Sequence, residues 1–117
     1  MQHRTSIILF FFVVFSVPAF AHMSAGELSL DCDAITTKRS EVWDVDRTSK
    51  SGLCLGYLNA VFDFIDSDTQ FEVTRDFNVA AMMECFQRYA PKHNGDPADK
   101  AVVSALIGDG YIKRREN

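Results

Sequence analysis

The sequence predicts a small all-α domain of four helices, or slightly more, held by a disulfide. Apolar residues recur at helical spacing in four segments between residues 24 and 108. No segment shows the clear alternation of apolar and polar residues that marks a half-buried strand. Three cysteines follow a leader typical of exported proteins, so a disulfide is expected to support a core of this size.

The N-terminus has the three regions of a cleavable signal peptide. Arg4 precedes an apolar run at residues 7–17, and an A-x-A cleavage site follows at residues 19–21. The run is far shorter than the ~20 residues that a membrane-spanning helix needs. We expect cleavage after Ala21 and a single domain of residues 22–117 in the periplasm, with no membrane attachment after processing.

The first helix is predicted to begin at Ser24. Ser24 and Glu27 have the S-x-x-E spacing of a capping box, in which each side chain bonds the other residue's backbone amide. Leu28, Cys32 and Ile35 then share one face. The helix is expected to end between residues 36 and 39, and residues 38–50 to form a loop with Trp43 folded onto the core.

The second helix is predicted from Thr48 or Ser49 to Ile65, ending by Ser67. Gly56 lies inside it and costs about 1 kcal/mol relative to alanine. A glycine there either lets another backbone come close or bends the helix. The expected apolar stripe comprises Leu53, Cys54, Tyr57, Leu58, Val61, Phe62 and Ile65.

A linker follows in which Phe71 and Val73 could lie extended. The third helix is predicted to begin with a cap at Thr74 or Asp76 and to run to Tyr89, before Pro91. Its expected apolar set is Phe77, Ala80 or Ala81, Met83 or the neighbours of Glu84, Phe86 and Ala90.

The fourth helix has a strong start signal. Asp96 is predicted to cap it, with Pro97 in the first helical position. Gly108 and Gly110 are predicted to end it, and residues 113–115 to form a mobile tail.

The cysteines are Cys32, Cys54 and Cys85, which allow three single pairings. Cys32 and Cys54 lie on the apolar faces of the first two helices, and a helical hairpin would bring those faces together. We therefore predict the Cys32–Cys54 bridge and a buried, inert thiol at Cys85.

Several kinds of chemistry are disfavoured. The net charge of −4 argues against a nucleic-acid partner, which needs a basic surface. There is no C-x-x-C or H-E-x-x-H motif, and the calcium-like start at Asp44 has Ser49 where a glycine is required. Cys85 and His93 lack an evident orienting group. We predict no catalytic residue, metal or cofactor, and hence no enzyme.

Two segments are candidates for contact with a partner protein. Asp63 and Asp66, with Asp68 and Glu72 nearby, form an acidic group that is either a solvated face or a surface that steers a basic partner. The second segment lies between two prolines and is either a simple connector or a presented binding loop. It comprises Lys92, His93, Asn94 and Gly95.

The order of motifs resembles the Rap/Tai immunity proteins, which protect bacteria against peptidoglycan amidases delivered by type VI secretion. The resemblance is carried by S-A-G-E-L at residues 24–28, Cys32, C-L-G-Y-L at residues 54–58 and the acid Asp63. Phe71, Val73 and Thr74, and the prolines at 91 and 97, fit the same order.

This resemblance implies a small all-α periplasmic protein, commonly dimeric, that blocks the catalytic cleft of an amidase and has no catalysis of its own. It also implies the Cys32–Cys54 bridge. Relatives often have a second bridge, but Glu72 occupies one of its positions here.

The expected function is therefore a homodimeric periplasmic immunity protein bound to a cell-wall amidase. Two alternatives remain open: a periplasmic acid-stress chaperone of the HdeA type, and an inhibitor of another exported hydrolase, such as a lysozyme.

Overall fold

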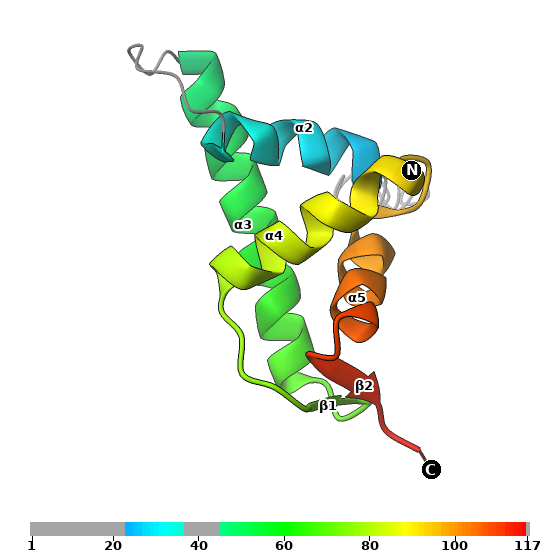
Figure 1. Cartoon of the computed structure of the whole chain (residues 1–117). Coiled ribbons are helices and arrows are strands. Elements are labelled where there is room, and N and C mark those ends of the chain that lie inside the picture. The colour runs from blue at the N-terminus through cyan, green and yellow to red at the C-terminus, as the bar shows by residue number, and fades with distance from the viewer. Residues whose placement is uncertain (1–22, 37–44, 117) are drawn as a thin grey trace, which may run out of the picture.

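The computed structural model describes residues 23–36 and 45–116, and it confirms the mostly helical, disulfide-linked fold. In Figure 1, α2 and α4 cross α3, α4 passes in front of α3, and α5 lies beside them. The signal peptide, its cleavage site and Trp43 lie outside the described residues. The four α-helices of the described part are α2 (Ala25–Thr36), α3 (Val45–Ser67), α4 (Val79–Tyr89) and α5 (Ala98–Gly108).

The capping box at the start of α2 is confirmed. The Glu27 amide donates to Ser24 Oγ at 3.1 Å, and the Ser24 amide donates to Glu27 Oε1 at 3.4 Å. Leu28 and Cys32 are fully buried on the inner face, whereas Leu30 is 66% exposed on the outer face. This amphipathic pattern turns one side of α2 towards α3.

Helix α3 begins at Val45, so the expected loop at residues 45–50 and the start at Thr48 or Ser49 are wrong. Arg47 Nε donates to the Ala34 carbonyl at 2.8 Å and ties the first turn to α2. Asp46 and Lys50 add an ion pair of 3.2 Å one turn apart, and Asp46 also suits the positive end of the helix dipole.

The predicted disulfide is confirmed. Cys32 and Cys54 are bonded, with their Cα atoms 5.0 Å apart, and the bridge joins α2 to α3. Both cysteines are fully buried, and Met83 Sδ lies 3.9 Å from Cys54 Sγ. The bridge therefore lies inside the core, where α4 covers it.

A two-stranded antiparallel sheet joins the end of α3 to the C-terminal segment. It consists of β1 (Phe71–Val73) and β2 (Ile112–Arg114), with Glu72 opposite Lys113. The predicted mobile tail at residues 113–115 is therefore wrong. Gly110, at φ 79°, turns the chain back into β2, where Ile112 is 1% exposed.

Helix α4 is capped by Asn78, whose Oδ1 accepts from the Ala81 amide at 2.8 Å, so the caps predicted at Thr74 and Asp76 are wrong. Thr74 Oγ1 instead donates to the Gly110 carbonyl at 2.7 Å and supports the sheet. Of the expected apolar set, Phe86 and Ala90 are buried, but the other buried positions are Met82 and Cys85.

The predicted cap of α5 is also wrong. Pro97 occupies the cap position, one residue before α5, and no side chain caps the helix. The Asp96 side chain instead lies 3.2 Å from His93 Nδ1. The predicted end of the helix at Gly108 is confirmed.

One core lies between the four helices and the sheet. Its largest fully buried side chains are Leu28, Cys32, Cys54, Leu58, Met82, Phe86, Val102, Leu106 and Ile112. Within the part of the chain that is described, no helix combines the length and the hydropathy that crossing a membrane requires.

Candidate functional site

The loop between α4 and α5 is fixed to the N-terminus of α2. The chain passes through a short 3-10 helix, η2 (Ala90–Lys92), before it reaches this loop. The Ala25 amide donates to the Asp96 carbonyl at 2.8 Å, and the Gly26 amide donates to the Asn94 carbonyl at 3.0 Å. Two of the amides that a helix start leaves without a partner are thus satisfied by the loop.

Gly26 permits this close contact because it has no side chain. A Cβ atom at Gly26 would lie 3.3 Å from both Asn94 Cβ and the Asn94 carbonyl oxygen. Any larger residue would push the loop away from the helix. The S-A-G-E-L segment therefore serves two purposes: it caps α2 and it holds the loop.

The side chains of the predicted loop differ in how firmly they are held. The His93 ring stacks on Tyr89 with centroids 3.9 Å apart and an angle of 5° between the planes. His93 Nδ1 also lies 3.2 Å from Asp96 Oδ2. Lys92, Asn94 and Gly95 are exposed.

The second predicted contact group, Asp63 and Asp66, lies elsewhere. Both residues are exposed on the C-terminal part of α3. In Figure 1 this part of α3 is at the lower end of the molecule, next to β1, whereas the α4–α5 loop is at the upper right. The structure does not bring the two groups together into one surface.

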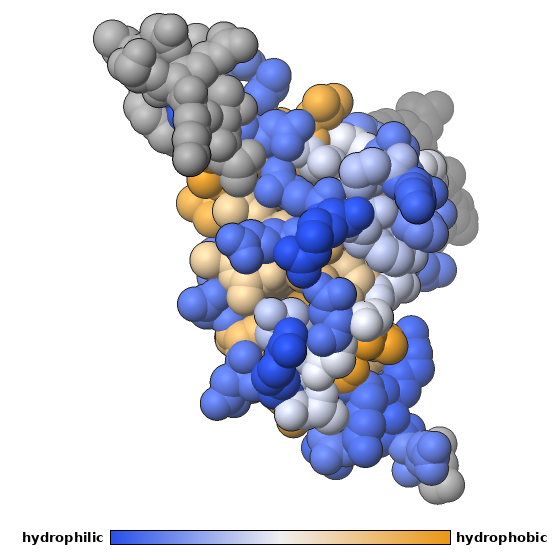
Figure 2. Space-filling view, viewed as in Figure 1, coloured by the Kyte–Doolittle hydropathy of each residue, from blue (hydrophilic) through white to orange (hydrophobic). Residues whose placement is uncertain are grey.

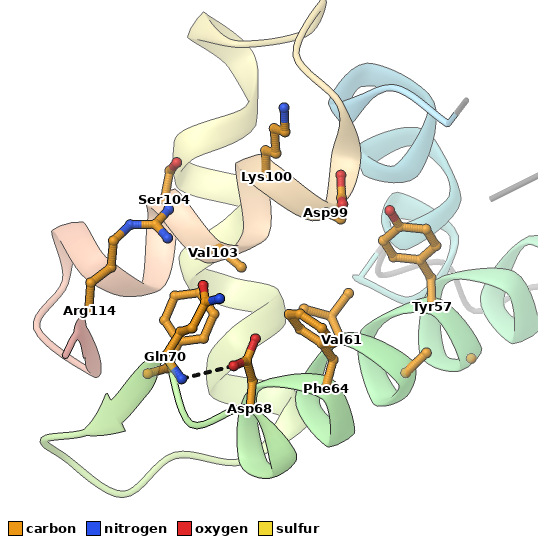
Figure 3. Close-up of a pocket in the computed structure, with 13 residues that line it drawn as sticks. Tyr57, Val61, Phe64, Asp68, Gln70, Asp99, Lys100, Val103, Ser104 and Arg114 are labelled. Carbon is orange, nitrogen blue, oxygen red and sulfur yellow. Dashed lines mark hydrogen bonds between the residues drawn. The ribbon is translucent and has the colours of Figure 1, made fainter. Parts of the chain in front are cut away.

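A groove between α3 and α5 is the site that sequence reasoning missed. It has a volume of about 640 Å³ and is predominantly apolar (Figure 3). Because α4 lies behind the groove in Figure 3 and in front of α3 in Figure 1, the groove opens on the face turned away in Figure 1. Its lining residues are Gly56, Tyr57, Ala60, Val61, Phe64, Asp68, Gln70, Phe71, Asp99, Lys100, Val103, Ser104 and Arg114.

The spacing along α3 contained a signal for this groove. Leu53 was assigned to the buried stripe but is 47% exposed, and Phe64 is 56% exposed. Together with Gly56 and Ala60 they follow a second helical row, beside the row that faces the core. Sequence periodicity merged the two rows into one.

A different apolar area reaches the surface on the other side of α3. Figure 2 shows apolar side chains where α3 and α4 cross, surrounded by hydrophilic residues. On these two helices, Phe62 of α3 and Met83 of α4 are half-buried and pack against the core. This area is a continuation of the core rather than a hollow.

Charged groups are found at both ends of the groove. Arg114 lies over the Phe71 ring, with its guanidinium carbon 5.3 Å from the ring centroid. At the other end, Tyr57 points towards Asp99 (Figure 3). Burial, and then the charge of Asp99, raise the pKa of Tyr57 to about 12, although a hydrogen bond with the Asp99 backbone opposes the rise.

The one cysteine outside the disulfide is buried, and its thiol is held in the protonated form. Cys85 is 2% exposed, and burial, followed by a hydrogen bond to Asp109, raises the pKa of its thiol to about 12. His93 is engaged with Tyr89 and Asp96. Residues 23–36 and 45–116 contain no group of three or more side chains placed to hold a metal ion.

Comparison with known proteins adds no relative. No family model, no curated protein and no solved structure matches this chain.

Proposed function

We propose that this chain is a homodimeric periplasmic immunity protein that binds a type VI secretion peptidoglycan amidase and blocks its catalytic cleft sterically. The proposal extends the resemblance in the motif order. The observation that supports it most is the attachment of the α4–α5 loop to the start of α2, since that start is part of the resemblance.

A fixed loop suits an inhibitor for a thermodynamic reason. A flexible loop loses conformational entropy when it is bound, and this loss weakens the complex. Here two backbone hydrogen bonds to Ala25 and Gly26 fix the loop before any partner arrives. The Cys32–Cys54 bridge also ties α2, which carries the loop, to the longest helix.

The disulfide is compatible with the expected compartment. Disulfides persist in the bacterial periplasm and are rare in the reducing cytosol. A protein that protects against a cell-wall hydrolase has to act where the cell wall is, so the bridge and the proposed task agree.

The test is protection of living cells. An amidase encoded beside this chain is directed to the periplasm, and growth is measured with and without the full chain. We expect the chain to restore growth and Lys92→Gln to weaken the protection. Lys113→Gln, which removes the same charge from β2, is the matched control and should protect fully.

No protection against any amidase encoded beside the chain would overturn the proposal. In that case, recovery of a different exported hydrolase with the purified chain would favour the wider inhibitor class.

A further inference from the structure

The groove between α3 and α5 has the size and the apolar floor of a small-molecule site. Its volume of about 640 Å³ lies within the range of roughly 300–1,000 Å³ that is usual for such sites. Phe64 is largely exposed at its rim, and the Phe64 ring meets the Phe71 ring edge-on at 6.5 Å. The buried residues that line it are Tyr57, Val61, Phe71 and Val103.

Hydrogen-bond donors gather at one end of this groove. Arg114 turns its guanidinium towards Ser104 there, and Gln70 lines the same end (Figure 3). Within the described residues, Arg114 has no ion pair, and the side chains of Ser104 and Gln70 have no hydrogen bond. Arg114 lies over the Phe71 ring, which leaves the N–H groups of its planar fork for an acceptor such as a carboxylate.

The other charged residues of the groove do not cancel this arrangement. Asp68 Oδ1 already accepts a hydrogen bond of 2.8 Å from the Gln70 amide. Asp99 is at the opposite end, and Lys100 points its amine away from the other labelled side chains in Figure 3. One end of the groove therefore offers donors and the other end an acid, so a ligand with a single negative charge is oriented with that charge at Arg114.

We propose that the groove binds a single-chain fatty acid, with its carboxylate on Arg114 and Ser104 and its hydrocarbon chain on the apolar floor towards Tyr57. A guanidinium forks onto a carboxylate through two parallel hydrogen bonds. One guanidinium with Asp68 nearby suits a single negative charge better than the almost double charge of a phosphate group. This site is separate from the α4–α5 loop and does not depend on the proposed immunity function.

A fatty acid matches both parts of the groove in one molecule. A neutral apolar ligand would cover the donors at the Arg114 end without giving them an acceptor, which costs free energy. A cationic amphiphile would place its charge against Arg114 or leave its chain outside the groove. A fatty acid supplies the acceptor and the apolar chain together.

The main test is a calorimetric titration of the purified, oxidised protein with dodecanoate, below the concentration at which dodecanoate forms micelles. We expect one site per chain. Butanoate, which has the head without the long chain, should not bind. Decanoate should bind up to about tenfold more weakly than dodecanoate, because two methylene groups no longer cover the floor. Dodecyltrimethylammonium, with the same chain length and the opposite charge, should bind more weakly still.

The position of the head group is tested at Arg114. We expect Arg114→Gln to weaken dodecanoate binding by about tenfold, because the carboxylate loses a charged donor. The same variant should bind 1-dodecanol as the wild type does. Lys113→Gln is the matched control, since it removes the same charge from the neighbouring position of β2, where Lys113 pairs with Glu72. That variant should bind dodecanoate unchanged.

The position of the chain is tested on α3. Gly56 lines the groove, and a Cβ atom there would have nothing within 4 Å. Gly56→Leu should therefore fill the groove, abolish dodecanoate binding and keep the circular dichroism spectrum of the wild type. Gly52→Leu is the control, because Gly52 is one turn earlier, outside the groove lining, and equally open. That variant should keep full binding.

Three results would overturn this inference. They are a wild-type protein that does not bind dodecanoate, dodecanoate binding that Gly56→Leu leaves intact, and equal affinity for dodecanoate and dodecyltrimethylammonium. A wild-type protein without dodecanoate binding whose cell protection is lost in Gly56→Leu would assign the groove to the amidase instead. The titrations use the chain alone, so the fatty-acid site and the proposed function can fail separately.

Discussion

At the scale of single residues, environment decides what each reactive group can do. Cys85 has the chemistry of a nucleophile, but its thiol is buried and hydrogen-bonded to Asp109. Asp109 also holds Arg88 in an ion pair of 2.6 Å, and the contacts with Cys85 and Arg88 lower the pKa of Asp109. Burial of the thiol therefore favours its protonated, less nucleophilic form, while the carboxylate remains charged at the surface.

We expect Cys85 to resist thiol reagents at pH 8 in the folded protein and to react fully in denaturant. The raised pKa of Cys85 also makes stability depend on pH. The neutral, buried thiol makes its full contribution to the free energy of unfolding below the ordinary pKa of 9.0. This contribution is lost as the pH rises towards about 12, because the unfolded chain then releases the proton more readily than the folded one. Counting labelled thiols by mass spectrometry checks the expected resistance of Cys85 to thiol reagents. Complete labelling of folded protein at pH 8 would contradict it.

At the scale of the element, helix starts depend on which polar groups are free to cap them. Ser24 caps α2 through the local pair it forms with Glu27, a pattern contained within four residues. At α5 the expected cap Asp96 is drawn to His93 instead. A helix cap is thus predictable from the sequence when no other side chain competes for the capping group. It is not predictable when a neighbouring side chain binds that group instead.

Replacing Ser24→Ala should lower the free energy of unfolding by about 1 kcal/mol, because the Glu27 amide loses its acceptor. Urea denaturation followed by circular dichroism measures the change. Ser104→Ala, at an exposed position inside α5, serves as the control and should cost nothing. An equal loss in both variants would show that the capping box contributes nothing.

At the scale of the whole molecule, the disulfide and the sheet each connect two segments that are far apart in the sequence. The bridge spans a separation of 22 residues between α2 and α3. The sheet joins β1 to β2 across α4 and α5, with an ion pair of 3.5 Å between Lys113 and Glu72. For a core this small, such closures matter as much as local helix propensity.

Reducing the Cys32–Cys54 bridge should lower the free energy of unfolding by about 3 kcal/mol, the chain-entropy value for a loop of this length. Denaturant titrations with and without reductant measure the loss. In the double variant Cys32→Ala with Cys54→Ala, reductant should leave the free energy of unfolding unchanged. A reductant effect that persists in that variant would mean that the bridge is not its cause.

The sequence by itself determined the four helices, the cap at Ser24, the end at Gly108 and the bridge between Cys32 and Cys54. Each of these follows from residues close together in the chain or from apolar faces that must be buried. Helical spacing needs only neighbours three and four positions apart, so it is readable without a structure.

Only the tertiary structure decided the early start of α3, the sheet, the fixed loop and the groove. Arg47 bonding Ala34, Asn94 lying on Gly26 and β2 pairing with β1 all join residues that are distant in sequence. Such contacts form where folded elements pack together, and no local periodicity in the sequence predicts them. The second row on α3 was present in the sequence, but only the packing of α5 beside it showed which row the core uses.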